Sequence, residues 1–463
     1  MDVVLERLRR LPPSSQHALK LLACLGNNTD IPTLKIVLGA TEAEINENLR
    51  AAVQSGAIVS RGGSYQFLHD RIQEAAYALV PEALRLTLHC QIGQRLLAEL
   101  TEAEITERIF DIVNQLNVGV LPGFDPDDKA RLGRLNLQAG LRAKASTAYA
   151  SACHYFMFGL ALLGDDGWAT AYDLSFKLML ERAECELQRG KLDVSAEFIE
   201  RLLLKAESRT DRTQAFRLKI TLQKLHGEMA LAAQTAIECL KMFEMTYPEH
   251  PTDKDVQQEY EDLKRRIGSR SIESLIELSL IDDPEIRAVS GTLLELCLCF
   301  YYVDSTLFDI LVCRIVKLSI QYGHSEACTV GYGLLGASLG PVFDRFDDGE
   351  RFAQLAVAVS ERHRFLAQRT GSYFLLHMAL ACTRTIDEAM RCLDAGNQAA
   401  VETGEVVFAC YCATYRIMNL LARGEPLDLI WPETAKALTF VREKGYMPAK
   451  SILLARPSAS SRR

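Results

Sequence analysis

Residues 57–70, AIVSRGGSYQFLHD, decide how the beginning of this chain folds. Two short runs with β-branched and aromatic residues flank Gly62 and Gly63, and a glycine pair tolerates the positive φ angles that a two-residue hairpin turn requires. The stretch therefore predicts a strand, a tight turn and a second strand. From residue 70 to residue 80 the apolar residues follow the spacing of an amphipathic helix.

The junction between the second strand and that helix gathers His69, Asp70, Arg71, Gln73 and Tyr77. Such a set raises the question of catalysis, but Asp70 followed three residues later by Gln73 is typical of a helix N-cap. The apolar positions of the helix form one stripe, made of Ile72, Ala75, Ala76 and Leu79. We expect Arg71 to pair locally and a nearby hydrogen bond to hold His69. We interpret the five residues as a structural junction motif without a catalytic role.

Three helical segments precede the hairpin. Residues 11–26, LPPSSQHALKLLACLG, and residues 30–39, DIPTLKIVLG, each carry start signals and an apolar stripe that stops at a glycine. Residues 41–56, TEAEINENLRAAVQSG, begin with the T-x-x-E spacing of a capping box. Three helices followed by a hairpin predict a winged-helix-like domain over residues 1–80.

A winged helix commonly binds DNA through its third helix, which here carries Glu42, Glu44 and Glu47 against Arg50. These carboxylates would repel the phosphates of a duplex. The chain has a formal net charge of -8 and a sequence pI near 5.7, so it lacks the basic field that nucleic acid or an anionic membrane surface attracts. We therefore do not expect nucleic acid or a membrane as a partner.

Residues 81–450 alternate amphipathic segments of helix length with short breaks, which predicts an all-α region. Residues 184–203 and 221–240 share a helix, glycine, helix layout with Gly190 and Gly227 in the turns. Their separation of 37 exceeds the tetratricopeptide period of about 34 residues, so the repeats are degenerate. The pattern predicts a tetratricopeptide-like superhelix, whose stacked hairpins suit contact with another protein.

Proline, glycine and aspartate interrupt the helical pattern at residues 246–255 and 340–352, and we predict loops there. The acidic residues of the second segment lack the ligand spacing of a calcium loop, so no metal site is expected. The last residues, 451–463, become small, polar and basic. They are predicted to form a disordered tail.

The 13 cysteines stand singly or as C-x-C and never in the C-x-x-C spacing of a zinc site. We expect them to be reduced and mostly buried, which suits a cytoplasmic protein. Residues 1–15 lack the apolar core of a signal peptide, and no apolar run is long enough for a membrane-spanning helix. The expected location is cytoplasmic.

The order of several stretches resembles a family of very large bacterial proteins that join a serine/threonine kinase-like domain, an AAA-type ATP-binding domain and a sensor histidine kinase. The stretches that carry the resemblance are LPPSSQHALKLLACLG, AAVQSGAIV, YQFLHDRIQEAAYALVP, LHCQIGQRLL, RIFDIVNQLNVG, LNLQAGLRAKASTAYASACHYFMFGLALL, LERAECELQRGKLDVSAEFI, SIESLIELSLIDDPEIRA and AGNQAAVETGEVVFACYCATY. They extend to about residue 445. In that family this region resembles the helical arm between the nucleotide-binding module of a STAND-type ATPase and a sensor histidine kinase.

The resemblance implies a non-catalytic arm for protein interaction and signal relay in a two-component system, with a nucleotide-binding or kinase module as its partner. The chain departs from the family because it has no phosphate-binding loop: Gly190 and Lys191 are followed by Leu192 rather than Ser or Thr. We expect no cofactor and no enzyme activity for this chain, and we expect it to be a fragment. The alternative is a winged-helix transcription regulator with a helical effector domain.

Overall fold

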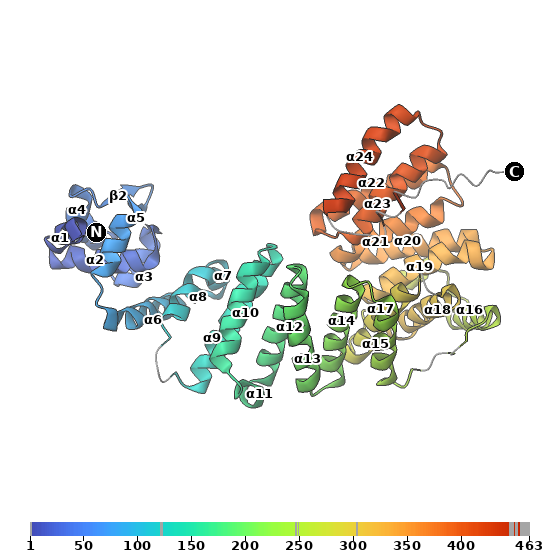
Figure 1. Cartoon of the computed structure of the whole chain (residues 1–463), viewed down its shortest axis with the longest axis horizontal. Helices are drawn as coiled ribbons and strands as arrows, with labels where there is room; N and C mark the ends of the chain where they lie inside the picture. The colour runs from blue at the N-terminus through green and yellow to red at the C-terminus, as the bar shows by residue number, and fades with distance from the viewer. Residues whose placement is uncertain are drawn as a thin grey trace. The chain divides into compact units, whose positions relative to one another are not determined.

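The structure of the protein is a computed structural model that describes residues 2–120, 124–245, 248, 250–301, 304–443, 449, 452 and 453. Among these residues the chain is mainly α-helical, with 24 α-helices, one 3-10 helix and a three-stranded sheet near the N-terminus (Figure 1). The predicted mainly α fold class is confirmed to this extent. The chain divides into two compact units, Met1–Lys205 and Ala206–Arg463. Most of the predicted tail, residues 451–463, lies outside the described residues.

The first 80 residues of unit 1 form a helical cluster with a small sheet. The elements are α1 (Asp2–Arg9), α2 (Pro13–Leu25), β1 (Asn28–Asp30), α3 (Ile31–Leu38), α4 (Glu42–Gln54), β2 (Ile58–Arg61), β3 (Ser64–Phe67) and α5 (Asp70–Ala78). The predicted hairpin is confirmed, since β2 and β3 pair antiparallel and Gly62 and Gly63 have φ angles of 54° and 80°. The predicted start signals of α3 and α4 are also confirmed, by an Asp30 cap and a complete Thr41 capping box.

Strand β1 was not predicted. It pairs antiparallel with β3, so the sheet has the order β1-β3-β2. With only three residues it is too short to show an alternating pattern in the sequence. The inner face of β3 places Tyr65 and Phe67 in a core cluster with Leu22 and Leu49, which joins the sheet to α2 and α4.

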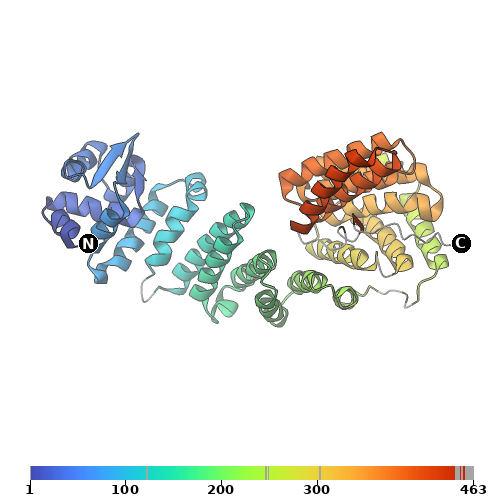
Figure 2. The same cartoon turned by 45° about the horizontal axis from the view of Figure 1, so that its top comes forward.

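Unit 1 continues as a series of helices. They are α6 (Glu82–Glu99), α7 (Glu102–Glu107), α8 (Ile109–Val118), α9 (Pro126–Ala145), α10 (Tyr149–Leu163), α11 (Gly167–Thr170), α12 (Tyr172–Gln188) and α13 (Leu192–Lys205). Neighbours along the chain lie side by side, as Figure 2 shows for the teal α9 and α10 and the greener α12. The predicted turn at Gly190 is confirmed, since this residue has a φ of 71° between α12 and α13.

Unit 2 consists of helices, most of which contribute to one large apolar core. Its elements are α14 (Arg209–Leu225), α15 (Met229–Lys241), α16 (Asp253–Ile267), the 3-10 helix η1 (Glu273–Glu277), α17 (Pro284–Phe300), α18 (Ser305–Tyr322), α19 (Glu326–Phe343), α20 (Phe346–Arg362), α21 (Leu366–Leu380), α22 (Ile386–Thr403), α23 (Val407–Ala422) and α24 (Leu427–Glu443). The core cluster extends from Ile220 on α14 to Cys412 on α23. Gly227, with a φ of 80°, forms the predicted turn between α14 and α15.

The loop predicted at residues 340–352 is wrong for most of its length. Helix α19 continues through Pro341 to Phe343, and α20 begins at Phe346. Only Asp344 and Arg345 separate the two helices, and Asp344 turns the chain with a φ of 54°. The other predicted loop, at residues 246–255, includes positions outside the described residues, and its last three residues already belong to α16.

Candidate functional site

The strand-to-helix junction is capped by His69 rather than by Asp70. Asp70 is the first residue of α5, and the backbone N–H of Arg71 donates a 3.3 Å hydrogen bond to Nδ1 of His69. The predicted Asp70 cap is therefore wrong by one position. Gln73 does not complete a capping box either, since its Nε2 donates to the carbonyl of Ala23 at 3.4 Å. The expected hydrogen bond to His69 is present, although the side chain lies at the surface.

Tyr77 leads from this junction into a buried polar chain. Its hydroxyl lies 3.1 Å from Nε2 of His89, and Nδ1 of the same ring lies 2.7 Å from Oε1 of Gln115. Nε2 of Gln115 in turn donates to the carbonyl of Cys24 at 2.7 Å. Because Oε1 of Gln115 can only accept, Nδ1 of His89 carries the hydrogen, and Nε2 of a neutral ring accepts from Tyr77. This series of hydrogen bonds thus joins α5, α6, α8 and α2.

Sequence reasoning found Tyr77 but missed the other members of this polar chain. His89 and Gln115 are separated by 26 residues, and the carbonyl of Cys24 is 91 residues from Gln115. No local spacing indicates such a contact. Arg85 adds a cation–π contact, with its guanidinium carbon 5.0 Å from the centre of the Tyr77 ring. Burial raises the pKa of Tyr77, which keeps its hydroxyl protonated as a donor.

We expect Gln115→Leu to lower the free energy of unfolding of unit 1 by about 2 kcal/mol, because it leaves the N–H of His89 and the carbonyl of Cys24 without partners in a buried place. Urea denaturation followed by circular dichroism measures the change. Gln94→Leu, at an exposed position of α6, is the matched control and should leave stability within about 0.5 kcal/mol. Equal losses for the two variants would show that the polar chain does not stabilise the unit.

The effect expected for His69→Ala is much smaller. The side chain is exposed and makes one local hydrogen bond, so its removal should cost no more than about 0.5 kcal/mol, the lower end of the range for an N-cap. The same denaturation experiment measures it. A loss comparable to that of Gln115→Leu would contradict the view that His69 is only a surface cap.

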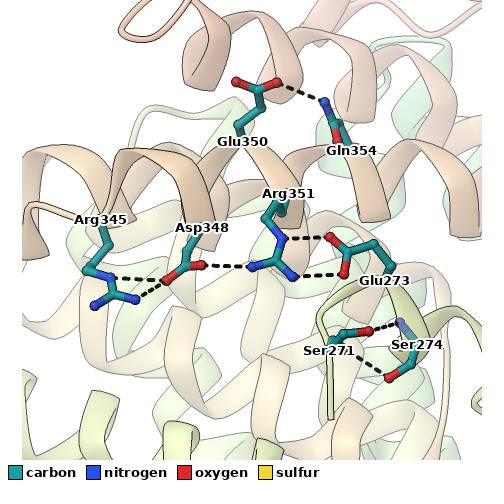
Figure 3. Close-up of polar contacts among 8 residues, drawn as sticks. All are labelled: Ser271, Glu273, Ser274, Arg345, Asp348, Glu350, Arg351 and Gln354. Atoms are coloured by element: carbon teal, nitrogen blue, oxygen red, sulfur yellow. Dashed lines mark hydrogen bonds and ion pairs between the residues drawn. The ribbon is translucent and has the colours of Figure 1, made fainter.

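Unit 2 carries a second candidate site, a row of charged residues where η1 lies against α20 (Figure 3). We call Glu273, Arg345, Asp348 and Arg351 the η1–α20 charged row. Arg351 donates from Nε and Nη2 to the two carboxylate oxygens of Glu273 at 2.6 and 2.8 Å, and from Nη1 to Asp348 at 3.2 Å. Arg345 donates to the other Asp348 oxygen at 3.0 and 2.6 Å. The charges alternate along the row, which runs from Arg345, just before α20, through Asp348 and Arg351 on α20 to Glu273 on η1.

The charged row orients η1 rather than holding a reactive group. The hydrogen-bonded Arg351 guanidinium lowers the pKa of Glu273 to about 2, so this carboxylate is ionised at neutral pH. Arg362 at the end of α20 makes a similar two-bond contact with Glu277, at 2.7 and 2.9 Å. These carboxylates are exposed, and each pair alone adds little stability. Two bidentate contacts nevertheless fix both ends of η1 on one helix.

Glu350 joins α20 to the next hairpin. Its carboxylate accepts from the Arg384 guanidinium at 3.0 to 3.3 Å and from the Thr383 hydroxyl at 3.0 Å, both in the turn between α21 and α22. Gln354 also donates to it at 3.0 Å, as Figure 3 shows. Helix α20 is therefore linked by carboxylate contacts to η1 and to the α21–α22 turn.

Residues 340–352, whose acidic residues lack the spacing of a calcium loop, contribute to these ion pairs. Asp348 is engaged by Arg345 and Arg351, and Asp347 lies in the first turn of α20, where negative charge is favourable. Within the described ranges no three His, Cys, Asp or Glu side chains gather as a metal ion would require. Most of the 13 cysteines are buried, as predicted; Cys382 is exposed and Cys392 partly so. In the part of the chain that the structure describes, no helix is both long and apolar enough to cross a membrane.

Comparison with known proteins gives remote relatives. No family model matches the chain. It is 20% identical over 537 residues to the hybrid signal transduction histidine kinase G of Dictyostelium discoideum, in an alignment that covers 98% of this chain and 16% of that protein. The chain thus spans about a sixth of the length of this relative. Among solved structures, a STAND protein with a tetratricopeptide repeat sensor from Pyrococcus horikoshii matches with a TM-score of 0.38 and 12% identity, covering 97% of this chain and 66% of that one.

Proposed function

We propose that this chain is a non-catalytic arm for protein interaction and signal relay in a protein of the STAND-type ATPase and sensor histidine kinase kind. The observation that carries the proposal is the alignment of 98% of the chain with one part of a hybrid histidine kinase, of which it covers 16%. In this proposal residues 1–80 act as a winged-helix-like domain and residues 81–450 as a tetratricopeptide-like superhelix. The partner is a nucleotide-binding or kinase module, encoded with this chain or separately.

The contacts within unit 2 support a relay role. The Arg351–Glu273 contact links α20 to η1. The Arg384–Glu350 contact links α20 to the α21–α22 turn. A displacement of η1 would therefore move α20, and through it the α21–α22 turn, because these contacts are directional and bidentate. A partner that binds near one hairpin would in this way change the position of the next.

The alternative function, a winged-helix transcription regulator, is disfavoured by the charges on α4. Glu44 is exposed and engaged in the Thr41 capping box, and Arg50 is paired with Glu47 at 3.1 Å. The helix that would read the major groove thus offers carboxylates and one neutralised cation to DNA. Duplex binding measured by fluorescence anisotropy should be weak and nearly independent of salt. Submicromolar affinity that falls steeply with added salt would favour the regulator.

We expect the chain to show no binding of ATP in isothermal titration calorimetry, since it has no phosphate-binding loop sequence. Micromolar ATP binding would contradict the non-catalytic part of the proposal. The interaction part is tested by crosslinking mass spectrometry on the tagged chain in cells of its source. Crosslinks to a protein with a nucleotide-binding or kinase module support the proposal, and their absence in the presence of abundant crosslinks to other proteins overturns it.

A further inference from the structure

Helix α24 carries an apolar stripe whose first residues the other described residues leave exposed. Leu427 is 72% exposed and Trp431 is 74% exposed, values that are unusual for such large apolar side chains. Ala435, which is exposed, lies four residues after Trp431, and Leu438, which is half-buried, lies three residues after Ala435, so the four side chains form one stripe along the helix. Another face of α24 packs within unit 2, because Ile430, Ala437 and Val441 are buried in small clusters with residues of α23.

Two charged residues flank this stripe at its ends. Asp428 lies one residue after Leu427, and Arg442 lies four residues after Leu438. Both are exposed, and neither has an ion-pair partner among the residues that the structure describes. By contrast, Glu433 and Lys436, on the other side of the helix, pair with each other at 2.8 Å.

The positions of these charges are self-complementary. Asp428 and Arg442 lie at equal distances along the sequence on either side of Ala435. When two copies of α24 cross antiparallel at Ala435, Asp428 of each copy faces Arg442 of the partner subunit, and Trp431 of each copy meets the stripe of the other near Leu438. The small side chain of Ala435 at the twofold axis lets the two backbones approach. Such an arrangement is the isologous contact of a C2 dimer.

We propose that a second copy of this chain docks on the Leu427–Trp431–Ala435–Leu438 face of α24, as an antiparallel helix pair closed by two Asp428–Arg442 ion pairs. An aromatic residue in an apolar centre with charges at the rim is the usual anatomy of a protein interface. A single helix pair buries less than the roughly 1,200 Å² of a stable interface, so this dimer forms reversibly and depends on concentration. The site goes beyond the proposed relay function and does not require it.

Sedimentation equilibrium of the full chain over a range of concentrations tests this proposal. The wild type should show a monomer–dimer equilibrium, and Trp431→Glu should weaken dimerisation by at least about tenfold. Leu429→Glu is the matched control, because Leu429 is 60% exposed on the same helix but points away from the stripe. It should dimerise as the wild type does. A chain that stays monomeric at every concentration, or a Trp431→Glu variant that dimerises normally, overturns the proposal.

Charge reversal separates this geometry from other modes of association. Asp428→Arg and Arg442→Asp should each weaken the dimer about tenfold, and the double variant should recover to within about threefold of the wild type. Circular dichroism melts establish that every variant is folded. Failure of the double variant to recover, when both single variants weaken the dimer, shows that the two residues do not face each other and overturns the antiparallel pairing.

Discussion

Gly336→Val should lower the free energy of unfolding of unit 2 by about 3 kcal/mol or more. Helices α19 and α20 cross at Gly336 and Gly349 with their backbones in contact. A Cβ at Gly336 would lie 2.7 Å from the carbonyl oxygen of Gly349 and 2.8 Å from the amide nitrogen of Ala353. Because the obstructing atoms belong to a backbone, they cannot turn away as a flexible side chain can. The helices would have to separate, and the core between them would open.

Denaturant unfolding and hydrogen exchange of the α19 and α20 amides measure this effect. Gly291→Ala is the matched control, since it is also a helical glycine of unit 2 and its Cβ would meet only the end of the Arg217 side chain, at 3.2 Å. It should be neutral or stabilise by up to about 1 kcal/mol, because alanine favours the helix. Wild-type stability and exchange in Gly336→Val would show that α19 and α20 do not cross as closely as described.

The same crossing explains why the loop predicted at residues 340–352 is wrong. Glycine, proline and aspartate normally indicate a break, and the segment contains all three. Here Gly340 and Gly349 lie inside helices, where a side chain would collide with Phe346 and with the carbonyl of Gly336. The glycines serve close packing rather than a turn. A single sequence does not distinguish these two uses, because both require only the absence of a side chain.

The N-terminal elements were predictable because their signals are local. The Gly62–Gly63 turn, the Asp30 cap and the Thr41 capping box each depend on residues within three positions of one another. The polar contacts of both candidate sites depend on residues far apart. Glu273 and Arg351 are 78 residues apart, and Tyr77 reaches Gln115 only through His89. Helical periodicity assigns such residues to one face of a helix, but it does not tell which other helix that face packs against. These contacts could therefore be identified only from the structure.

Acid should weaken unit 2 through His324. This side chain is 1% exposed, and its Nε2 donates to the carbonyl of Leu275 at 3.0 Å. Its backbone also joins the segment after η1, donating to Ser279 and accepting from Ile281. Burial, with a further contribution from neighbouring His363 and Arg362, lowers the pKa of His324 to about 4. The ring is therefore neutral in the folded state at pH values where it is protonated in the unfolded chain.

The direction of the pH dependence follows from that difference. An unfolded histidine has a pKa of about 6.5, so between pH 6.5 and pH 4 the unfolded state binds the extra proton. Protonation of His324 therefore leaves the free energy of unfolding of unit 2 unchanged above about pH 6.5. As the pH falls from there to about 4, it lowers that free energy by about 3 kcal/mol in total. The loss should be visible as faster hydrogen exchange of residues 275–281 before the rest of the unit opens.

His324→Gln tests this assignment, because an amide can still donate to Leu275 but does not titrate. We expect the variant to be less stable at neutral pH, since glutamine fills the site less well, and to lose much less stability than the wild type between pH 6.5 and pH 4. His154→Gln, at an exposed position of α10, should keep the wild-type pH dependence. If His324→Gln and the wild type lose stability in parallel over this range, other groups carry the acid sensitivity and the buried neutral state of His324 is not its cause.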